Sequence, residues 1–226
     1  MNGYAGFDRL DPPTAAQRAW LRKCANANLR WLGGYLPSPS QPSRAWCGLW
    51  PTLRTEGWGL APVYVGQQAM GPGSHIVTAA RGAIDGRDAC VKMAAEGFPA
   101  KSRVFLDLES PSPEFIASGY VAAWIDAVFA NAFSAAIYCS FAQGPQLARL
   151  RPNAGVDVWV YHVPTVGRTS YPTDDFPDLD PQTSGFAGAS LWQLRDNVAI
   201  PDAAAPGGWM VVDLDSSIRA DPSAAN

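Results

Sequence analysis

Two carboxylates end a hydrophobic segment near the middle of the chain. Asp107 and Glu109 close the run 103–110, and the prolines that follow stop a strand there. Because side chains alternate across a strand, both acids point to one face, with Cα atoms roughly 6–7 Å apart. Burying two like charges together is unfavourable unless one holds a proton or both are hydrogen-bonded. The pair therefore favours acid–base chemistry, although a strand that simply runs out into solvent explains it as well.

Acids, tyrosines and amides also stand at the ends of other hydrophobic segments. Asp8 follows the first segment, and Asp213 and Asp215 close the last. If the segments are the strands of a barrel, their carboxyl ends converge on the face where barrel enzymes carry their sites. The sequence then predicts one strongly acidic site. The candidates for substrate contact at that face are Tyr35, Tyr64, Gln67, Gln68, Tyr138, Tyr161, Gln193 and Asp215.

Several acids together with aromatic and amide side chains suit glycoside hydrolysis. One protonated carboxyl donates to the leaving oxygen, and ionised carboxylates stabilise the positive charge that develops on the sugar or activate water. Glu109 is the expected general acid, because like charges around it would favour its protonated form. The neighbours that supply these charges are Asp107, Asp8 and Asp213.

Two other chemistries are less well supported. Ser110 and Ser140 have only His162 as a candidate base, and no side chain that would orient it is evident. A divalent cation held by the acids would suit a phosphodiesterase, but few Lys, Arg or His residues stand near these segment ends. Two histidines and four widely separated cysteines make no convincing zinc set. We therefore expect no metal and no cofactor.

The rest of the sequence predicts the elements that bring these residues together. Strands are expected over 4–10, 30–36, 60–66, 103–109 and 134–140, and helices over 11–26, 43–55, 78–96, 113–131 and 143–150. Three further strands, over 157–163, 189–194 and 209–215, are separated by loops rich in Pro, Gly and Asp. This order predicts an α/β fold, a TIM-like β/α barrel of five β/α units followed by three strands with few helices, in a single domain over 1–226. A doubly wound sheet is the alternative, but the Gly-rich phosphate loop that usually follows its first strand is missing.

Composition excludes several classes of partner. The chain has 226 residues, 47% of them hydrophobic, and a net charge of −3, so it offers no basic surface for nucleic acid. No apolar run is long enough to cross a membrane, and residues 1–8 do not read as a Sec signal. No heptad pattern predicts a coiled-coil assembly, so we expect a monomer.

Five short motifs resemble a known family when they are taken in order. They are 6–8 (Gly-Phe-Asp), 63–68 (Val-Tyr-Val-Gly-Gln-Gln), 105–109 (Phe-Leu-Asp-Leu-Glu), 191–194 (Leu-Trp-Gln-Leu) and 212–215 (Val-Asp-Leu-Asp). Together they resemble the glycoside-hydrolase-like domain of unknown function that is related to family 25 lysozymes. The resemblance spans nearly the whole chain.

The resemblance implies a barrel of five β/α units and three strands, and muramidase activity on peptidoglycan or another N-acetyl-sugar polymer. The family's cleft acids correspond here to Asp8, Asp107, Glu109 and either Asp213 or Asp215. In such enzymes the N-acetyl group of the substrate can act as the internal nucleophile, steadied by an Asp. Because a Gln pair at 67–68 is typical of the glycoside-hydrolase-like relatives, a catalytically silent carbohydrate-binding or cell-wall module is the alternative.

The resemblance also implies a place of action. A muramidase must reach the cell wall or the outside of the cell, as an endolysin or an antibacterial factor does. Without a Sec signal, the routes that we expect are a phage holin, a dedicated secretion system or a signal that has been removed.

Overall fold

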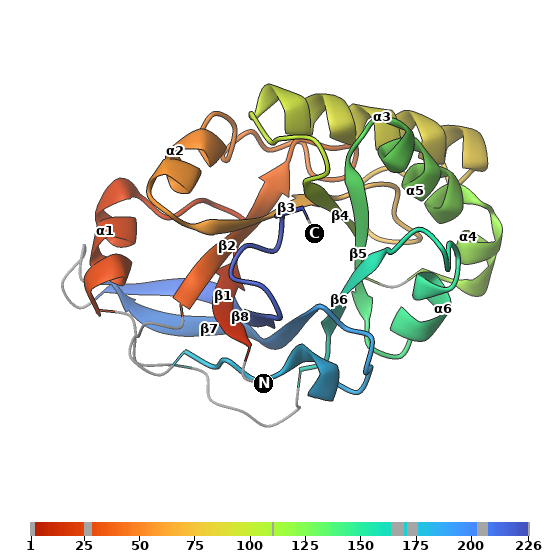
Figure 1. Cartoon of the computed structure of the whole chain (residues 1–226). Helices are drawn as coiled ribbons and strands as arrows, with labels where there is room; N and C mark the ends of the chain where they lie inside the picture. The colour runs from red at the N-terminus through yellow and green to blue at the C-terminus, as the bar shows by residue number, and fades with distance from the viewer. Residues whose placement is uncertain are drawn as a thin grey trace.

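Eight strands close into a barrel in the order of the sequence (Figure 1). The computed structural model describes residues 3–24, 29–109, 111–163, 170, 176–202 and 208–225. The strands are β1 (Tyr4–Asp8), β2 (Leu29–Leu36), β3 (Gly59–Tyr64), β4 (Arg103–Leu108), β5 (Ser134–Ser140), β6 (Asp157–Tyr161), β7 (Leu191–Asp202) and β8 (Gly208–Ser217). The predicted fold class, a TIM-like barrel, is confirmed.

The helices follow the first five strands. They are α1 (Ala15–Cys24), α2 (Trp50–Thr55), α3 (Ala79–Ala95), α4 (Pro113–Ala117), α5 (Tyr120–Ala130) and α6 (Gly144–Ala148). After β6 the only helical element among the described residues is a 3₁₀ turn, η1 (Pro181–Thr183). Neighbouring strands from β1 to β7 are parallel, whereas β8 is antiparallel to both β7 and β1. A hairpin can join β7 to β8 without a crossover helix, which is why the last strands need no helix between them.

Aromatic side chains fill the interior of the barrel. Trp31, Phe105 and Trp159 are fully buried there, and the Trp159 ring meets the edges or faces of the other two at centroid distances of 5.6 and 5.5 Å. Tyr138 lies against the same indole at 5.2 Å. A side chain at Gly6 would overlap the Trp31 ring, so only glycine fits beside it. We call Trp31, Phe105 and Trp159 the aromatic floor, because the acidic side chains lie above them.

The predicted helix 113–131 is wrong as one continuous element. Gly119 takes a left-handed backbone conformation, with φ of 80°, between α4 and α5. The Ser118 hydroxyl donates to the Phe115 carbonyl at 2.6 Å and accepts from the Tyr120 N–H at 3.2 Å. These bonds compete with helical ones, so the helix stops and restarts.

The predicted loop over 195–208 is also mostly wrong. β7 continues to Asp202 and β8 begins at Gly208, so the two strands form a long hairpin that extends beyond the barrel (Figure 1). Pro201 and Gly208, two of the residues that suggest a loop, occupy a ribbon whose register shifts twice, and residues 203–207 lie outside the described ranges. Part of the loop predicted after 163, the end of the first helix at 25–26 and the candidate Ser110 lie outside the described residues.

The C-terminal segment closes the end of the barrel opposite the acids. The Leu60 N–H donates to Asp221 Oδ1 at 2.9 Å, and the Ser223 N–H donates to the Leu60 carbonyl at 2.8 Å. The Arg103 N–H donates to the Ser223 carbonyl at 2.9 Å, and the buried Arg103 guanidinium pairs with Asp157. The lower end of the barrel is therefore sealed by main-chain bonds and one buried ion pair.

Candidate active site

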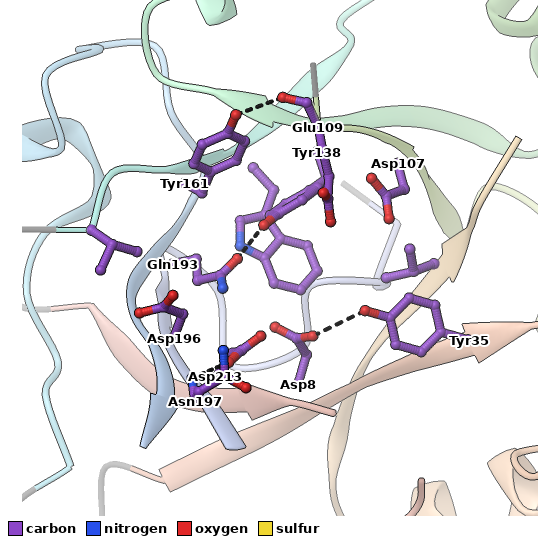
Figure 2. A pocket seen from close by; sticks show the side chains of 13 residues that line it. Asp8, Tyr35, Asp107, Glu109, Tyr138, Tyr161, Gln193, Asp196, Asn197 and Asp213 are labelled. Atoms are coloured by element: carbon purple, nitrogen blue, oxygen red, sulfur yellow. Dashed lines mark hydrogen bonds between the residues drawn. The ribbon is translucent and has the colours of Figure 1, made fainter. Parts of the chain in front are cut away.

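An acidic cavity of about 390 Å³ opens at the carboxyl ends of the strands (Figure 2). Its walls are Asp8, Tyr35, Val63, Asp107, Glu109, Tyr138, Trp159, Tyr161, Val163, Gln193, Asp196, Asn197 and Asp213. Among the described residues no Lys, Arg or His lines it. The carboxyl ends of the strands converge on this face. Asp8, Asp107, Glu109 and Asp213, which the sequence places at strand ends, therefore line one cavity.

The four acids differ in their exposure and their place. Asp8 and Asp213 are cross-strand partners in β1 and β8, so they lie side by side at one edge. Asp107 is 6% exposed on β4, whereas Glu109, just past the end of that strand, is exposed at the rim. Figure 2 shows Glu109 across the cavity from Asp8 and Asp213. A ligand entering the cavity would therefore meet Glu109 on one side and the aspartates on the other.

Asp8 and Asp215 interact beneath the cavity. Each carboxyl shifts the pKa of the other, and the Trp159 indole N–H donates to Asp215 Oδ1 at 3.1 Å. Burial, and then the charge of Asp213, raise the pKa of Asp8 to about 8. Burial, and then the charge of Asp8, raise the pKa of Asp215 well above its ordinary value. The contact between the two carboxyls lowers the pKa of Asp8 and raises that of Asp215, but burial is the largest effect on both.

Asp107 is the other strongly buried acid. Burial, followed by the charges of Glu109 and Asp8, raises the pKa of Asp107 well above its ordinary value. No donor among the described residues reaches Asp107 Oδ1. The Gln68 amide donates to the main-chain carbonyl of Asp107 at 3.3 Å, so Gln68 positions this strand end from outside the cavity. The protonated form that the sequence suggests for Glu109 stays a prediction.

Asp213 is held by the main chain of the neighbouring strand. The Asn197 N–H donates to Asp213 Oδ1 at 2.6 Å. This bond lowers the pKa of Asp213, but burial, the largest effect, leaves the pKa raised. Asp213 lines the cavity, whereas Asp215 lies fully buried beneath it, which corrects the predicted substrate contact of Asp215.

Tyrosine hydroxyls and one amide complete the wall. Tyr35 donates to Asp8 Oδ1 at 3.4 Å, and Tyr138 donates to Gln193 Oε1. Tyr161 donates to the main-chain carbonyl of Glu109 at 2.5 Å, which fixes the chain at the rim (Figure 2). Burial, and then the charge of Asp8, raise the pKa of Tyr35 well above its ordinary value, so its hydroxyl stays a donor. These four residues were predicted from the sequence to contact substrate, and all of them line the cavity.

Tyr64 and Gln67, which the sequence also predicts at the site, lie elsewhere. Alternation along β3 turns Val63 into the barrel and Tyr64 outward, where its hydroxyl donates to Asp88 Oδ2 at 2.7 Å. Gln67 is completely buried, and its amide donates to Asp85 Oδ2 at 2.8 Å. These contacts join the end of β3 to α3 and correct the predicted substrate contacts.

The sequence missed two polar wall residues. Asp196 and Asn197 lie where two residues of β7 face Asp213 of β8, and Asn197 has a left-handed backbone with φ of 49°. The bulge turns both residues over the cavity and aims the Asn197 N–H at Asp213. Asn is one of the few residues that adopt this conformation readily, but a bulge has no clear sequence signal.

A second cavity of about 260 Å³ adjoins the first. It shares Asp8, Tyr35, Asn197 and Asp213 with the first cavity, and its own residues are Arg9, Leu10, Asp11, Val211 and Val212. The two cavities therefore form one cleft that passes over Asp8 and Asp213. Across the described ranges, no set of three His, Cys, Asp or Glu side chains is arranged to hold a metal ion.

The cleft can act on a neutral, polar ligand. An exposed acid, two buried acids with raised pKa values and several hydroxyl and amide groups can donate and accept protons on opposite sides of it. Within the described parts of the chain, no helix is long and apolar enough to cross a bilayer.

Solved structures share this fold. The Tat-secreted protein Rv2525c of Mycobacterium tuberculosis, in complex with HEPES, has a TM-score of 0.58 at 16% identity, over 98% of this chain and 96% of that one. The Clostridium perfringens spore cortex lytic enzyme SleM has a TM-score of 0.62 at 12% identity, over 95% and 67%. The autolysin LytC of Streptococcus pneumoniae, in complex with a synthetic peptidoglycan ligand, has a TM-score of 0.59 at 7% identity, over 95% and 46%.

Sequence comparison identifies the family. No curated protein sequence matches the chain significantly. The model of the Rv2525c-like, glycoside hydrolase-like domain matches residues 16–196, which hold most of the barrel and every site acid except Asp8, Asp213 and Asp215. The resemblance seen in the motifs is therefore confirmed, and the chain belongs to the Rv2525c-like glycoside hydrolase-like domain family.

Proposed function

We propose that this protein is a glycoside hydrolase that cleaves the glycan strands of peptidoglycan, with Glu109 as its general acid. The observation that carries the proposal is the position of Glu109, an exposed acid facing buried acids across a cavity that no cationic side chain lines among the described residues. An acid on one side of the scissile bond and carboxyls on the other is the arrangement that glycoside hydrolysis requires.

The proposed reaction begins with proton transfer. The Glu109 carboxyl gives its proton to the glycosidic oxygen, and the bond from that oxygen to the sugar carbon breaks. The oxygen of the acetamido group on the same sugar bonds to the carbon. The N–H of that acetamido group donates to Asp107 Oδ1, which accepts no other hydrogen bond from the described residues. Water then attacks the carbon, the bond between the carbon and the acetamido oxygen breaks, and the water gives a proton back to Glu109. The positive charge that develops on the sugar faces the carboxyl oxygens of Asp8 and Asp213 at the opposite edge.

The comparisons support a cell-wall substrate. SleM is a spore cortex lytic enzyme, and LytC was solved with a peptidoglycan ligand, while Rv2525c is a Tat-secreted protein. The sequence identity to these structures is at most 16%. They therefore support peptidoglycan as the substrate polymer, but they do not identify the glycosidic bond that is cleaved. Action at the cell wall or outside the cell is part of the proposal.

The first test compares three proteins on purified peptidoglycan. Wild type is expected to release soluble fragments that end in reducing N-acetylmuramic acid, identified by mass analysis. Glu109→Gln, which cannot donate a proton, should lose at least about 100-fold in rate while it still binds glycan. Glu114→Gln, the same change at an exposed position on α4, should keep the wild-type rate.

A second candidate is a carbohydrate-binding module that keeps the cleft without turnover. Its support is that the buried carboxyls have raised pKa values, so the cavity can offer neutral hydrogen-bonding groups instead of charge. Glycan binding by wild type with no fragments released, from several walls and over pH 4 to 8, would overturn the hydrolase and favour this module.

A further inference from the structure

The β7–β8 hairpin carries an exposed apolar face beyond the acidic cavity. β1 ends at Asp8, opposite Asp213, but β8 begins five residues before Asp213, at Gly208. At about 3.3 Å per residue, Trp209 therefore lies about 13 Å from Asp213 along the strand. The Trp209 side chain is 61% exposed and that of Val211 is 50% exposed. Neighbouring exposed apolar side chains of this size on one strand are typical of a surface that binds a ligand or a partner.

This face is a continuation of the barrel interior. Side chains alternate along β8, so Trp209 and Val211 point to the same side as Asp213, while Met210 and Val212 are buried on the other side. The residues paired with them on β7 are Pro201, opposite Trp209, and Ala199, opposite Val211. We call Ala199, Pro201, Trp209 and Val211 the hairpin face. Its four residues carry no charged side chain.

The second cavity connects the hairpin face to the site. It is bounded by Asp8 and Asp213 where it meets the first cavity, and by Leu10 and Val211 where it meets the hairpin. Leu10 is itself 52% exposed. A polymer that leaves the acidic cavity on this side must pass Leu10 and Val211 before it reaches Trp209.

We propose that the hairpin face binds the sugars of a glycan chain that lie beyond the acidic cavity, with Trp209 as the stacking surface. The inference rests on the proposed function and adds the class of substrate: a long chain and not a short oligosaccharide. Aromatic rings stack on the apolar faces of sugars, and the small partners Ala199 and Pro201 leave the indole open. The continuity of the face with the cleft favours the glycan over a protein partner.

Binding of β-1,4-linked N-acetylglucosamine oligomers, from dimer to hexamer, tests the inference. Calorimetry in a Glu109→Gln background prevents turnover. Affinity is expected to rise with chain length, and Trp209→Ala should weaken hexamer binding roughly three- to tenfold while dimer binding is unchanged. Trp209→Phe, which keeps an aromatic face, should restore most of the loss. Val91→Ala, a change at another exposed apolar residue, on α3, should alter neither.

The outcomes separate the two proposals. Binding that rises with chain length but is indifferent to Trp209→Ala would overturn the role of the hairpin face and leave the proposed function standing. An equal loss for dimer and hexamer would overturn it too, because the effect would then lie in the acidic cavity. Failure of every oligomer, and of peptidoglycan, to bind would overturn both. Sedimentation that shows a wild-type dimer which Trp209→Ala dissociates would assign the face to a second copy instead.

Discussion

Asp215 supports the site from below without touching the cavity. It is fully buried, it accepts from the Trp159 indole, and its carboxyl interacts with that of Asp8. Because the indole bond fixes Asp215, its carboxyl holds Asp8 in place from below. In a hydrolase, Asp215 would thus be a positioning residue, while Asp8 and Asp213 face the substrate.

Replacing Asp215 by Asn should change how stability depends on pH. Both carboxyls of the pair have raised pKa values in the folded protein, about 8 for Asp8, so the folded state holds protons that the unfolded state releases above about pH 4. The stability that these protons contribute is therefore full below pH 4 and is lost as the pH rises toward 8. Asn keeps a donor but cannot ionise. Relative to wild type, Asp215→Asn should gain stability between pH 5 and pH 8.

Thermal unfolding at pH 5 and pH 8 measures this difference. A gain of 1 kcal/mol corresponds to about 2–4 °C in a chain of this size. Asp126→Asn is the matched control: the Arg151 hydrogen bond lowers the pKa of Asp126, so the effect of this substitution on stability should be the same at pH 5 and pH 8 and should change only in more acid solution. A melting-temperature difference between Asp215→Asn and wild type that is the same at both pH values would contradict the raised pKa values of the pair.

The sequence predicts a site residue correctly where it shows both the end of a strand and which of its alternating side chains point into the barrel. Asp8, Asp107 and Asp213 lie in the cavity because each ends an apolar segment and points inward by alternation. Tyr64 fails by one residue, since Val63 takes the inward position. Asn197 could not be predicted, because it depends on a register shift that tertiary pairing decides.

At the scale of single elements, the bulge in β7 shapes the cavity edge. It places the Asn197 N–H against Asp213 by means of a left-handed backbone. Asn197→Gly keeps that conformation and the N–H, so we expect little change in stability. Asn197→Val should cost about 1–3 kcal/mol, because a β-branched residue is strained at positive φ.

The comparison of the two Asn197 variants is the test. Chemical denaturation gives their free energies of unfolding, and oligosaccharide binding reports whether the edge has moved. The Val variant should also bind more weakly than the Gly variant. If Val and Gly are equal in both measurements, the bulge does not depend on its backbone conformation.

For the helices too, the local sequence pattern predicts the helical residues but not the tertiary contacts that divide them. Apolar periodicity correctly predicts helical residues over most of 113–131, but Gly119 divides them. The division allows the Tyr120 hydroxyl to donate to Asp85 at 2.9 Å and to accept from the Gln67 N–H at 3.0 Å. Periodicity carries no information about this long-range network, which ties α5 to the loop after β3.

For the molecule as a whole, Asp221 closes the lower end of the barrel. Its Oδ1 accepts from the Leu60 N–H and from the N–H and hydroxyl of Ser223. Asp221→Ala leaves a main-chain donor of β3 without this partner and should destabilise the protein by about 1–3 kcal/mol. Asp221→Asn keeps an acceptor and should lose less. Denaturant unfolding measures both variants.

Glycan affinity of the same variants is the second measurement. The acids lie at the opposite end of the barrel, so the affinity of the folded Asp221→Ala protein for oligosaccharide should match that of wild type. A variant that unfolds no more easily than wild type would show that the C-terminal segment does not hold the barrel closed.

The aromatic floor separates the effects of substitutions at the two ends of the barrel. Trp31, Phe105 and Trp159 lie between the carboxyls above and the Arg103–Asp157 pair below, as an apolar layer that neither set of charges crosses. Substitutions on distant sides of such a layer add instead of coupling. Substitutions at the lower end can therefore change stability without changing the acidity above, and the residues around the cavity can change their ligand contacts while the lower end keeps the barrel stable.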